Sequence, residues 1–169
     1  MSPSSRKILS YACLLGCTVC LAVGQVMTAQ WLALIITLVC GAGWWVAVYK
    51  RLAAGWFSVM LVVLVGLAAV GLLAGNPPVL MIFSAALALA SWDLALFDRT
   101  VTDLASTSAE TLTLFENSHY QNLALALGLG LSLAIGGRLL RFEIPLSGLI
   151  VLVFLALFGL DRVWRTLRH

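Results

Sequence analysis

The residues best suited to chemistry lie in one part of this sequence, where polar groups interrupt an otherwise apolar chain. Asp93 stands within the stretch "ASWDLALFDR", and His119, Tyr120, Gln121 and Asn122 form a polar run ahead of a later apolar stretch. A carboxylate beside a histidine can transfer a proton, hold a metal ion or bind a polar headgroup. The alternative is a purely structural role, in which the pair fixes the register of two helices. A carboxylate within a membrane needs a partner in either case. We predict this structural role for the candidate polar site.

Other chemical patterns are weak or missing. Cys17 and Cys20 have the spacing of a redox dithiol, but they lie in an apolar run, where a thiolate is disfavoured. The sequence contains no motif of serine hydrolases, zinc proteases or phosphate-binding loops. It has 2 histidines, one of them terminal, so a haem held by two histidines of this chain is not expected. The sequence therefore identifies no catalytic residue, no metal site and no cofactor, and it does not favour an enzyme.

The elements that position these residues follow from the distribution of charge. Hydrophobic residues make up 62% of the 169 residues and charged residues 10%, whereas soluble domains carry about 25% charged residues. No acidic or basic residue occurs in the ranges 8–49, 52–92, 117–137 and 144–160. A membrane-spanning helix needs about 20 apolar residues, so these ranges accommodate two, two, one and one helices. We expect the first run to be a membrane helix rather than a cleaved leader, because it is long for a signal peptide.

The predicted fold is therefore an all-α integral membrane protein, a bundle of six transmembrane helices in a single domain over residues 1–169. A polar segment separates the fourth and fifth helices, but Phe97, Val101 and Leu104 recur in it at helical spacing. Thr107 and Glu110 then match a capping box, which predicts a new helix start. We therefore expect a cytoplasmic helical hairpin that extends these two helices and brings Asp93 level with His119 and Phe97 opposite Phe115. The expected helices are approximately 8–27, 31–49, 55–74, 78–105, 108–139 and 145–163.

Small residues mark the surfaces on which the helices are expected to pack. Every even-numbered residue from Ala124 to Gly136 is small, which places two small stripes on opposite sides of the fifth helix. Such stripes let helix backbones approach closely in a membrane. The predicted helix-packing residues are Gly128, Ser132 and Gly136 on this helix and Gly16 and Cys20 on the first helix.

The positions of lysine and arginine predict the orientation. If the N-terminus is cytoplasmic, the inner side carries all of the 10 lysines and arginines except Arg138 and Arg141. We therefore expect both termini in the cytoplasm, in a bacterial or archaeal plasma membrane. Basic residues at a membrane surface attract anionic lipids, and the candidate headgroup ligands are Arg138, Arg141, Arg162 and Arg165. No basic patch is interleaved with exposed aromatic residues, so the partners expected are membrane lipids and not nucleic acid.

Two classes of function fit these features. The first is a non-catalytic subunit that packs within a larger membrane assembly, with other membrane subunits or copies of itself as partners. It is favoured by the small-residue stripes, by the patterned polar hairpin and by the absence of ionisable groups near the middle of the membrane. The second is a small permease or substrate-binding membrane component for a neutral or apolar solute. An enzyme that acts on lipid headgroups through Asp93 and His119 is a third, less favoured class.

Overall fold

The structure, a computed structural model, describes residues 3–50, 53–103 and 109–139, and these residues form five α-helices and no strand. The chain divides into two units, Met1–Ile135 and Gly136–His169, and all contacts reported below lie within the first. The predicted sixth helix (145–163), the turn of the predicted hairpin, and Arg141, Arg162 and Arg165 lie outside the described residues. The helices are α1 (Pro3–Met27), α2 (Trp31–Tyr49), α3 (Ala54–Leu73), α4 (Pro78–Asp103) and α5 (Ala109–Leu139).

Four of these helices are long and apolar enough to cross a membrane, so the predicted all-helical class is confirmed and a membrane location is consistent with it. The qualifying segments are Arg6–Met27, Trp31–Tyr49, Gly55–Leu73 and Pro78–Thr102. Helices form in such segments because their backbone hydrogen bonds can all be made within the segment. The helix bounds agree with the sequence prediction, except that α1 begins at Pro3 rather than near residue 8. Arg6 and Lys7 therefore belong to a helix and not to a tail.

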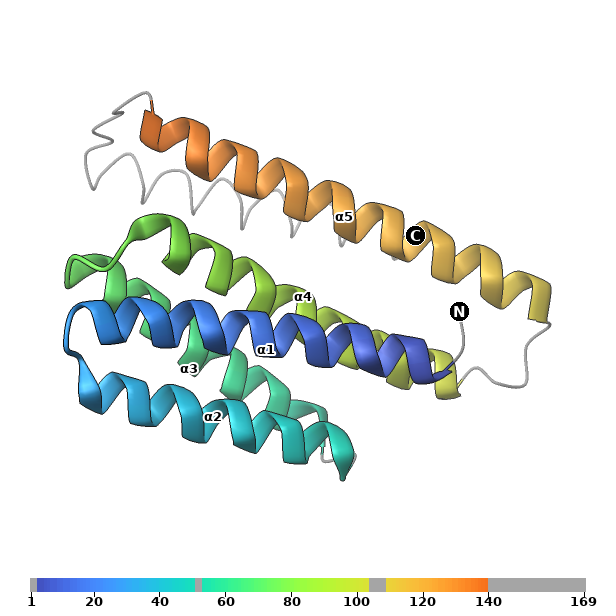
Figure 1. Cartoon of the computed structure of the whole chain (residues 1–169). Helices are drawn as coiled ribbons and strands as arrows, with labels where there is room; N and C mark the ends of the chain where they lie inside the picture. The colour runs from blue at the N-terminus through green and yellow to red at the C-terminus, as the bar shows by residue number, and fades with distance from the viewer. Residues whose placement is uncertain (1–2, 51–52, 104–108, 140–169) are drawn as a thin grey trace. The chain divides into compact units, whose positions relative to one another are not determined.

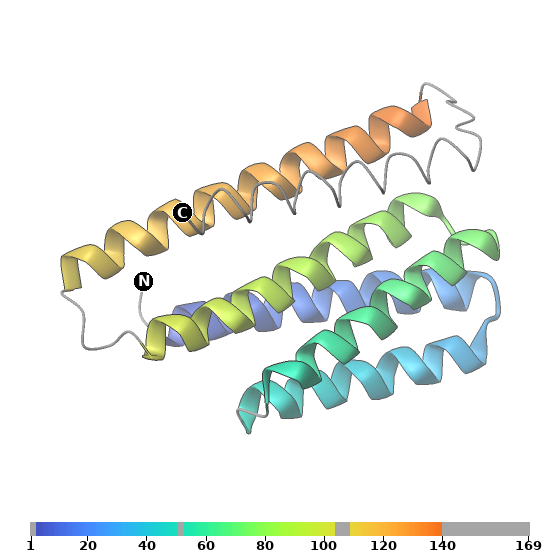
Figure 2. The ribbon, with the colours of Figure 1, turned by 180° about the vertical axis from the view of Figure 1, so that it is seen from behind.

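Helices α1–α4 form a bundle in which α1 lies along α4 in both views and also contacts α2 and α3 (Figures 1 and 2). Small residues permit this close contact: a Cβ placed on Gly16 of α1 would lie 3.0 Å from Leu87 of α4. The centre of the bundle is apolar and its side chains are almost fully buried. The core cluster includes Leu14, Cys17, Leu21, Trp44, Phe57, Leu64, Met81 and Ala88.

The α1–α2 and α3–α4 connections lie at the same end of the bundle, and α1 and α3 end with the same backbone conformation. After α3, Gly75 adopts a left-handed φ of 85°, and the N–H of Asn76 donates to the carbonyl of Gly71 over 2.9 Å. After α1, Ala29 adopts a left-handed φ of 55°, and the N–H of Gln30 donates to the carbonyl of Gln25 over 2.8 Å. Both are Schellman motifs, which satisfy the last carbonyls of a helix. Glycine meets this backbone conformation without strain, whereas alanine does not.

Polar side chains join these two turns. The Asn76 side chain is buried, and its Oδ1 accepts hydrogen bonds from Thr28 Oγ1 and from Gln30 Nε2, the latter over 3.2 Å. Nearby on α1, Gln25 Oε1 accepts from Thr37 Oγ1 of α2 over 3.0 Å. We call the end that carries these turns the turn end, and the opposite end, where α1 and α3 begin and α2 and α4 finish, the charged end.

Candidate functional site

The predicted juxtaposition of Asp93 and His119 is present at the charged end. His119 Nε2 lies 2.8 Å from Asp93 Oδ2, and the two side chains are 25% and 34% exposed. Phe97 and Phe115 also face each other, with ring centroids 5.5 Å apart. Both contacts join α4 to α5 in the register expected from helical spacing on either side of residues 104–108. The partly exposed carboxylate of Asp93 therefore has a polar partner on α5.

Phe97 holds the histidine from a second side. Its ring lies parallel to the imidazole of His119, with centroids 3.9 Å apart and an interplanar angle of 2°. The side chain of Phe97 is buried, and Tyr120 meets it edge-on at 5.8 Å. Stacking on a buried ring restricts the rotation of the imidazole, so His119 is held with its Nε2 towards Asp93.

The remaining members of the predicted polar site do not converge on this pair. Gln121 and Asn122 are exposed. Tyr120 meets His119 only through its ring, edge-on with centroids 6.2 Å apart. Its hydroxyl is buried, has no hydrogen-bond partner among the described residues, and lies within electrostatic reach of Arg6 and Glu116. The structure thus brings two of the five predicted residues into direct polar contact.

Sequence reasoning missed an ion cluster beside this pair, formed by Arg6 of α1, Asp98 of α4 and Glu116 of α5. Arg6 Nε lies 3.1 Å from Asp98 Oδ1, and Arg6 Nη1 contacts Glu116 Oε1. Arg6 and Glu116 are buried, with residue exposures of 7% and 6%. The predicted hairpin register already places Asp98 and Glu116 nearly level, and two carboxylates side by side require a cation. This requirement for a cation could be inferred from the sequence, but it does not identify Arg6 as the cation.

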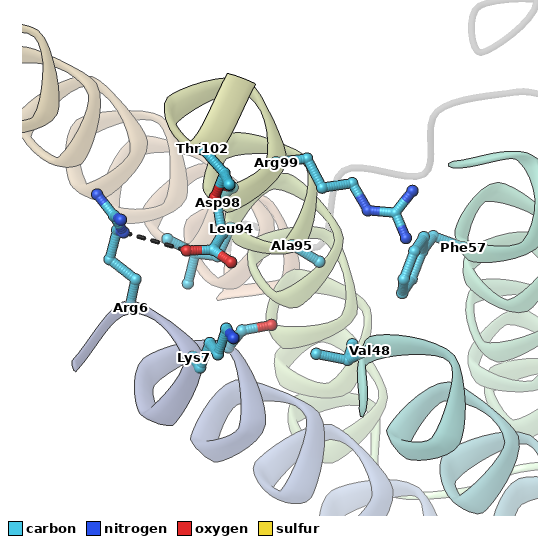
Figure 3. Close-up of a pocket in the computed structure, with 10 residues that line it drawn as sticks. Arg6, Lys7, Val48, Phe57, Leu94, Ala95, Asp98, Arg99 and Thr102 are labelled. Atoms are coloured by element: carbon cyan, nitrogen blue, oxygen red, sulfur yellow. Dashed lines mark hydrogen bonds and ion pairs between the residues drawn. The ribbon is translucent and has the colours of Figure 1, made fainter. Parts of the chain in front are cut away.

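A cavity of about 240 Å³ opens beside the ion cluster, between α1, α2, α3 and α4 (Figure 3). Arg6 and Lys7 reach it from α1, and Asp98 and Arg99 from α4. The guanidinium of Arg99 lies over the ring of Phe57, 4.5 Å from its centroid, which is a cation–π contact. The lining combines charge with apolar surface: Arg6, Lys7, Ser10, Val48, Phe57, Leu94, Ala95, Asp98, Arg99 and Thr102.

The predicted helix-packing residues fall into two groups. Gly16 packs on α4, as described above, and Cys20 is half-buried on the same helix. On α5, Gly128 and Ser132 are exposed and Gly136 is half-buried, and no described atom of another helix lies within 4 Å of a Cβ placed on Gly128. Arg138 belongs to the end of α5, and its side chain is not described. All four cysteines of the chain are free thiols.

The polar side chains that join one helix of α1–α4 to another lie at the two ends of the bundle and not in its middle. At the charged end, Ser10 Oγ donates to the carbonyl of Ser91 over 3.2 Å, one turn below the ion cluster. Between this layer and the Gln25–Thr37 pair lie the buried side chains of the apolar core. Thr18 and Ser84 turn their hydroxyls to carbonyls of their own helices. The arrangement can fix helices and bind a charged group at one end, but it offers no continuous polar route through these four helices.

The described residues contain no group of three histidine, cysteine, aspartate or glutamate side chains placed to hold a metal ion. Comparisons with protein-family models, with curated proteins and with solved structures give no match to this chain.

Proposed function

We propose that this protein is a non-catalytic subunit that packs within a larger membrane assembly. The observation that carries the proposal is the surface of α5 beyond its contact with α4. Leu125, Leu129 and Leu133 are 63%, 63% and 75% exposed. Between them, Gly128 and Ser132 are exposed as well, and no atom of the described chain lies within 4 Å of a Cβ placed on Gly128 or Gly130.

Lipid can cover such leucines without a loss of free energy. A stripe of small residues, in contrast, is stabilised by contact with another helix. Small side chains let two backbones approach closely, which increases van der Waals contact where the hydrophobic effect no longer drives association. We therefore assign this surface to a transmembrane helix of a partner subunit. The apolar middle of α1–α4 supports the same reading, because an ion or proton carrier would place ionisable or exposed polar groups there.

The proposed topology places the charged end in the cytoplasm of a bacterial or archaeal cell, with six membrane helices and both termini inside. Arg6, Lys7, Lys50 and Arg99 lie at this end, whereas the two turns that define the turn end, 28–30 and 74–77, contain no lysine or arginine. An excess of basic residues marks cytoplasmic loops. In this topology α4 and α5 continue beyond the membrane as a cytoplasmic helical hairpin, held by the Asp93–His119 and Phe97–Phe115 contacts.

Native mass measurement after mild detergent extraction from the source membrane tests the proposal. The wild-type protein should appear in a complex of defined mass that contains at least one other membrane protein in a fixed ratio. Gly128→Leu should lose that partner, because a large side chain separates the helices. Gly66→Leu on α3 is the matched control, since Gly66 is also an exposed helical glycine with open space around its Cβ but has no small-residue stripe. A lone wild-type protomer, or equal effects of the two variants, would contradict the proposal.

A second candidate is a small permease or substrate-binding membrane component for a neutral or apolar solute. It is favoured by a groove of about 330 Å³ between α1 and α2, whose lining is almost wholly apolar. Ala42→Trp would fill this groove from its exposed side. If the purified protein is a monomer and carries an apolar dye into proteoliposomes, and if this variant abolishes that uptake, the permease function replaces the subunit function. The groove is lined by Leu14, Leu15, Thr18, Leu38, Gly41, Ala42 and Trp45.

A further inference from the structure

The cavity at the charged end has a feature that neither function uses: it gathers three basic side chains around an apolar wall. Arg6, Lys7 and Arg99 contribute to its lining together with Val48 and Phe57 (Figure 3). We propose that this cavity binds a phosphate group, presented by the headgroup of an anionic phospholipid or by a soluble phosphate compound.

The charges of the cavity favour an anion. Asp98 is the only acidic residue in its lining, and its carboxylate binds Arg6 Nε over 3.1 Å. The Arg6 guanidinium also contacts Glu116, so Lys7 and not Arg6 is the side chain that would hold the anion. Lys7 is half-buried and forms no ion pair within the part of the chain that the structure describes. A partly desolvated ammonium interacts more strongly with an anion than one in bulk water. A phosphate with several acceptor oxygens can contact Lys7 while it faces the positive charge of Arg99.

The position and the shape of the cavity suit a headgroup. The cavity lies where four candidate membrane spans meet their charged ends, the level at which lipid phosphates lie. The Phe57 ring fixes the Arg99 guanidinium at its wall, so the cation is already in place before a ligand arrives. Lysine binds phosphate as a point charge and tolerates different ester groups. The site is therefore built to select phosphate charge rather than one particular headgroup.

Native mass spectrometry of the purified full chain in neutral detergent tests the site, with phosphatidylglycerol and phosphatidylcholine as the probes. Phosphatidylglycerol should bind more tightly, and Lys7→Gln should weaken its binding by roughly tenfold, as expected for the loss of one charge-assisted hydrogen bond. Lys50→Gln is the matched control, because Lys50 is exposed and does not line the cavity. Thr102→Phe keeps every charge but fills the exposed edge of the cavity, and it should also weaken binding.

Inorganic phosphate and glycerol 3-phosphate, each added alone at millimolar concentration, distinguish the two sources. If either raises the unfolding temperature of the wild type but not of Lys7→Gln, the ligand is a soluble phosphate compound. If only the diacyl lipid binds, the ligand is a headgroup. Equal weakening by Lys7→Gln and Lys50→Gln, or full binding to Thr102→Phe, would overturn the proposal, because the attraction would then come from the basic surface and not from the cavity.

Discussion

The imidazole of His119 lies flat on the ring of Phe97, with centroids 3.9 Å apart, while its Nε2 points at Asp93 Oδ2 over 2.8 Å. The histidine is thus held by its stack on Phe97 and by its polar contact with Asp93, which lies one helical turn before Phe97 on α4. This double restraint is what a register-fixing contact needs, because sliding α5 along α4 would break both interactions together. It places the Asp93–His119 pair among the contacts that hold α5 to the bundle.

Two substitutions of His119 should separate the contributions of its stack and of its polar contact to stability. His119→Ala removes the stack and the polar contact and should lower the free energy of unfolding by about 1–2 kcal/mol, the combined contribution of an aromatic pair and a partly exposed hydrogen bond. His119→Phe keeps the stack and should cost only about 0.5 kcal/mol. Unfolding in a denaturing detergent measures both. If His119→Phe were as destabilising as His119→Ala, the stack would contribute nothing.

Removal of Arg6 should be far more damaging. Arg6→Gln leaves the Asp98 and Glu116 carboxylates without a cation they share, and breaking a buried ion pair costs about 3–5 kcal/mol. Lys7→Gln, one residue away but outside the ion cluster, should cost no more than about 1 kcal/mol. Adding Asp98→Asn to Arg6→Gln should restore part of the stability, since one of the two neighbouring carboxylate charges is then gone. A double variant no more stable than Arg6→Gln would show that the carboxylates do not repel each other.

The two Schellman motifs predict that Ala29→Gly and Gly75→Ala change the free energy of unfolding in opposite directions. Ala29→Gly should raise the free energy of unfolding by about 1 kcal/mol, because alanine is strained in the left-handed region and glycine is not. Gly75→Ala should lower it by about the same amount for the same reason. Thermal unfolding in detergent compares the pair directly. Effects of equal sign would mean that the turn conformation at residue 29 or 75 differs from the one described.

The proposed orientation predicts which sites a membrane-impermeant thiol reagent can reach. Thr102→Cys, at the charged end, should react only in inside-out vesicles, and Ala74→Cys, at the turn end, only in right-side-out vesicles, because both positions are exposed. The wild type supplies the background, since its four cysteines all lie in the apolar spans. The reverse pattern would place the charged end outside the cell.

Much of the architecture could be predicted from local pattern. The charge-free ranges located α2, α3 and α4 closely, because the need to exclude charge from a membrane acts along the chain without regard to neighbours. The Asp93–His119 contact was predictable for a related reason. Only a few residues separate α4 from α5, so helical spacing on both sides sets which residues face each other. The early start of α1 was not predictable in this way, because its first residues are polar and become helical through the contacts of Arg6.

What the sequence by itself determined is therefore the set of apolar helices and the pairing between neighbours in the chain. The tertiary structure decided the contacts between distant segments: Arg6 lies 92 residues from Asp98 and 110 from Glu116, and Thr28 lies 48 residues from Asn76. The physical reason is the uniformity of the middle helices. α2 and α3 are apolar on every side, so hydrophobic periodicity, which reveals the inner face of a soluble helix, does not identify an inner face in them. Only side-chain packing selects which helices meet, and that selection creates both the ion cluster and the cavity beside it.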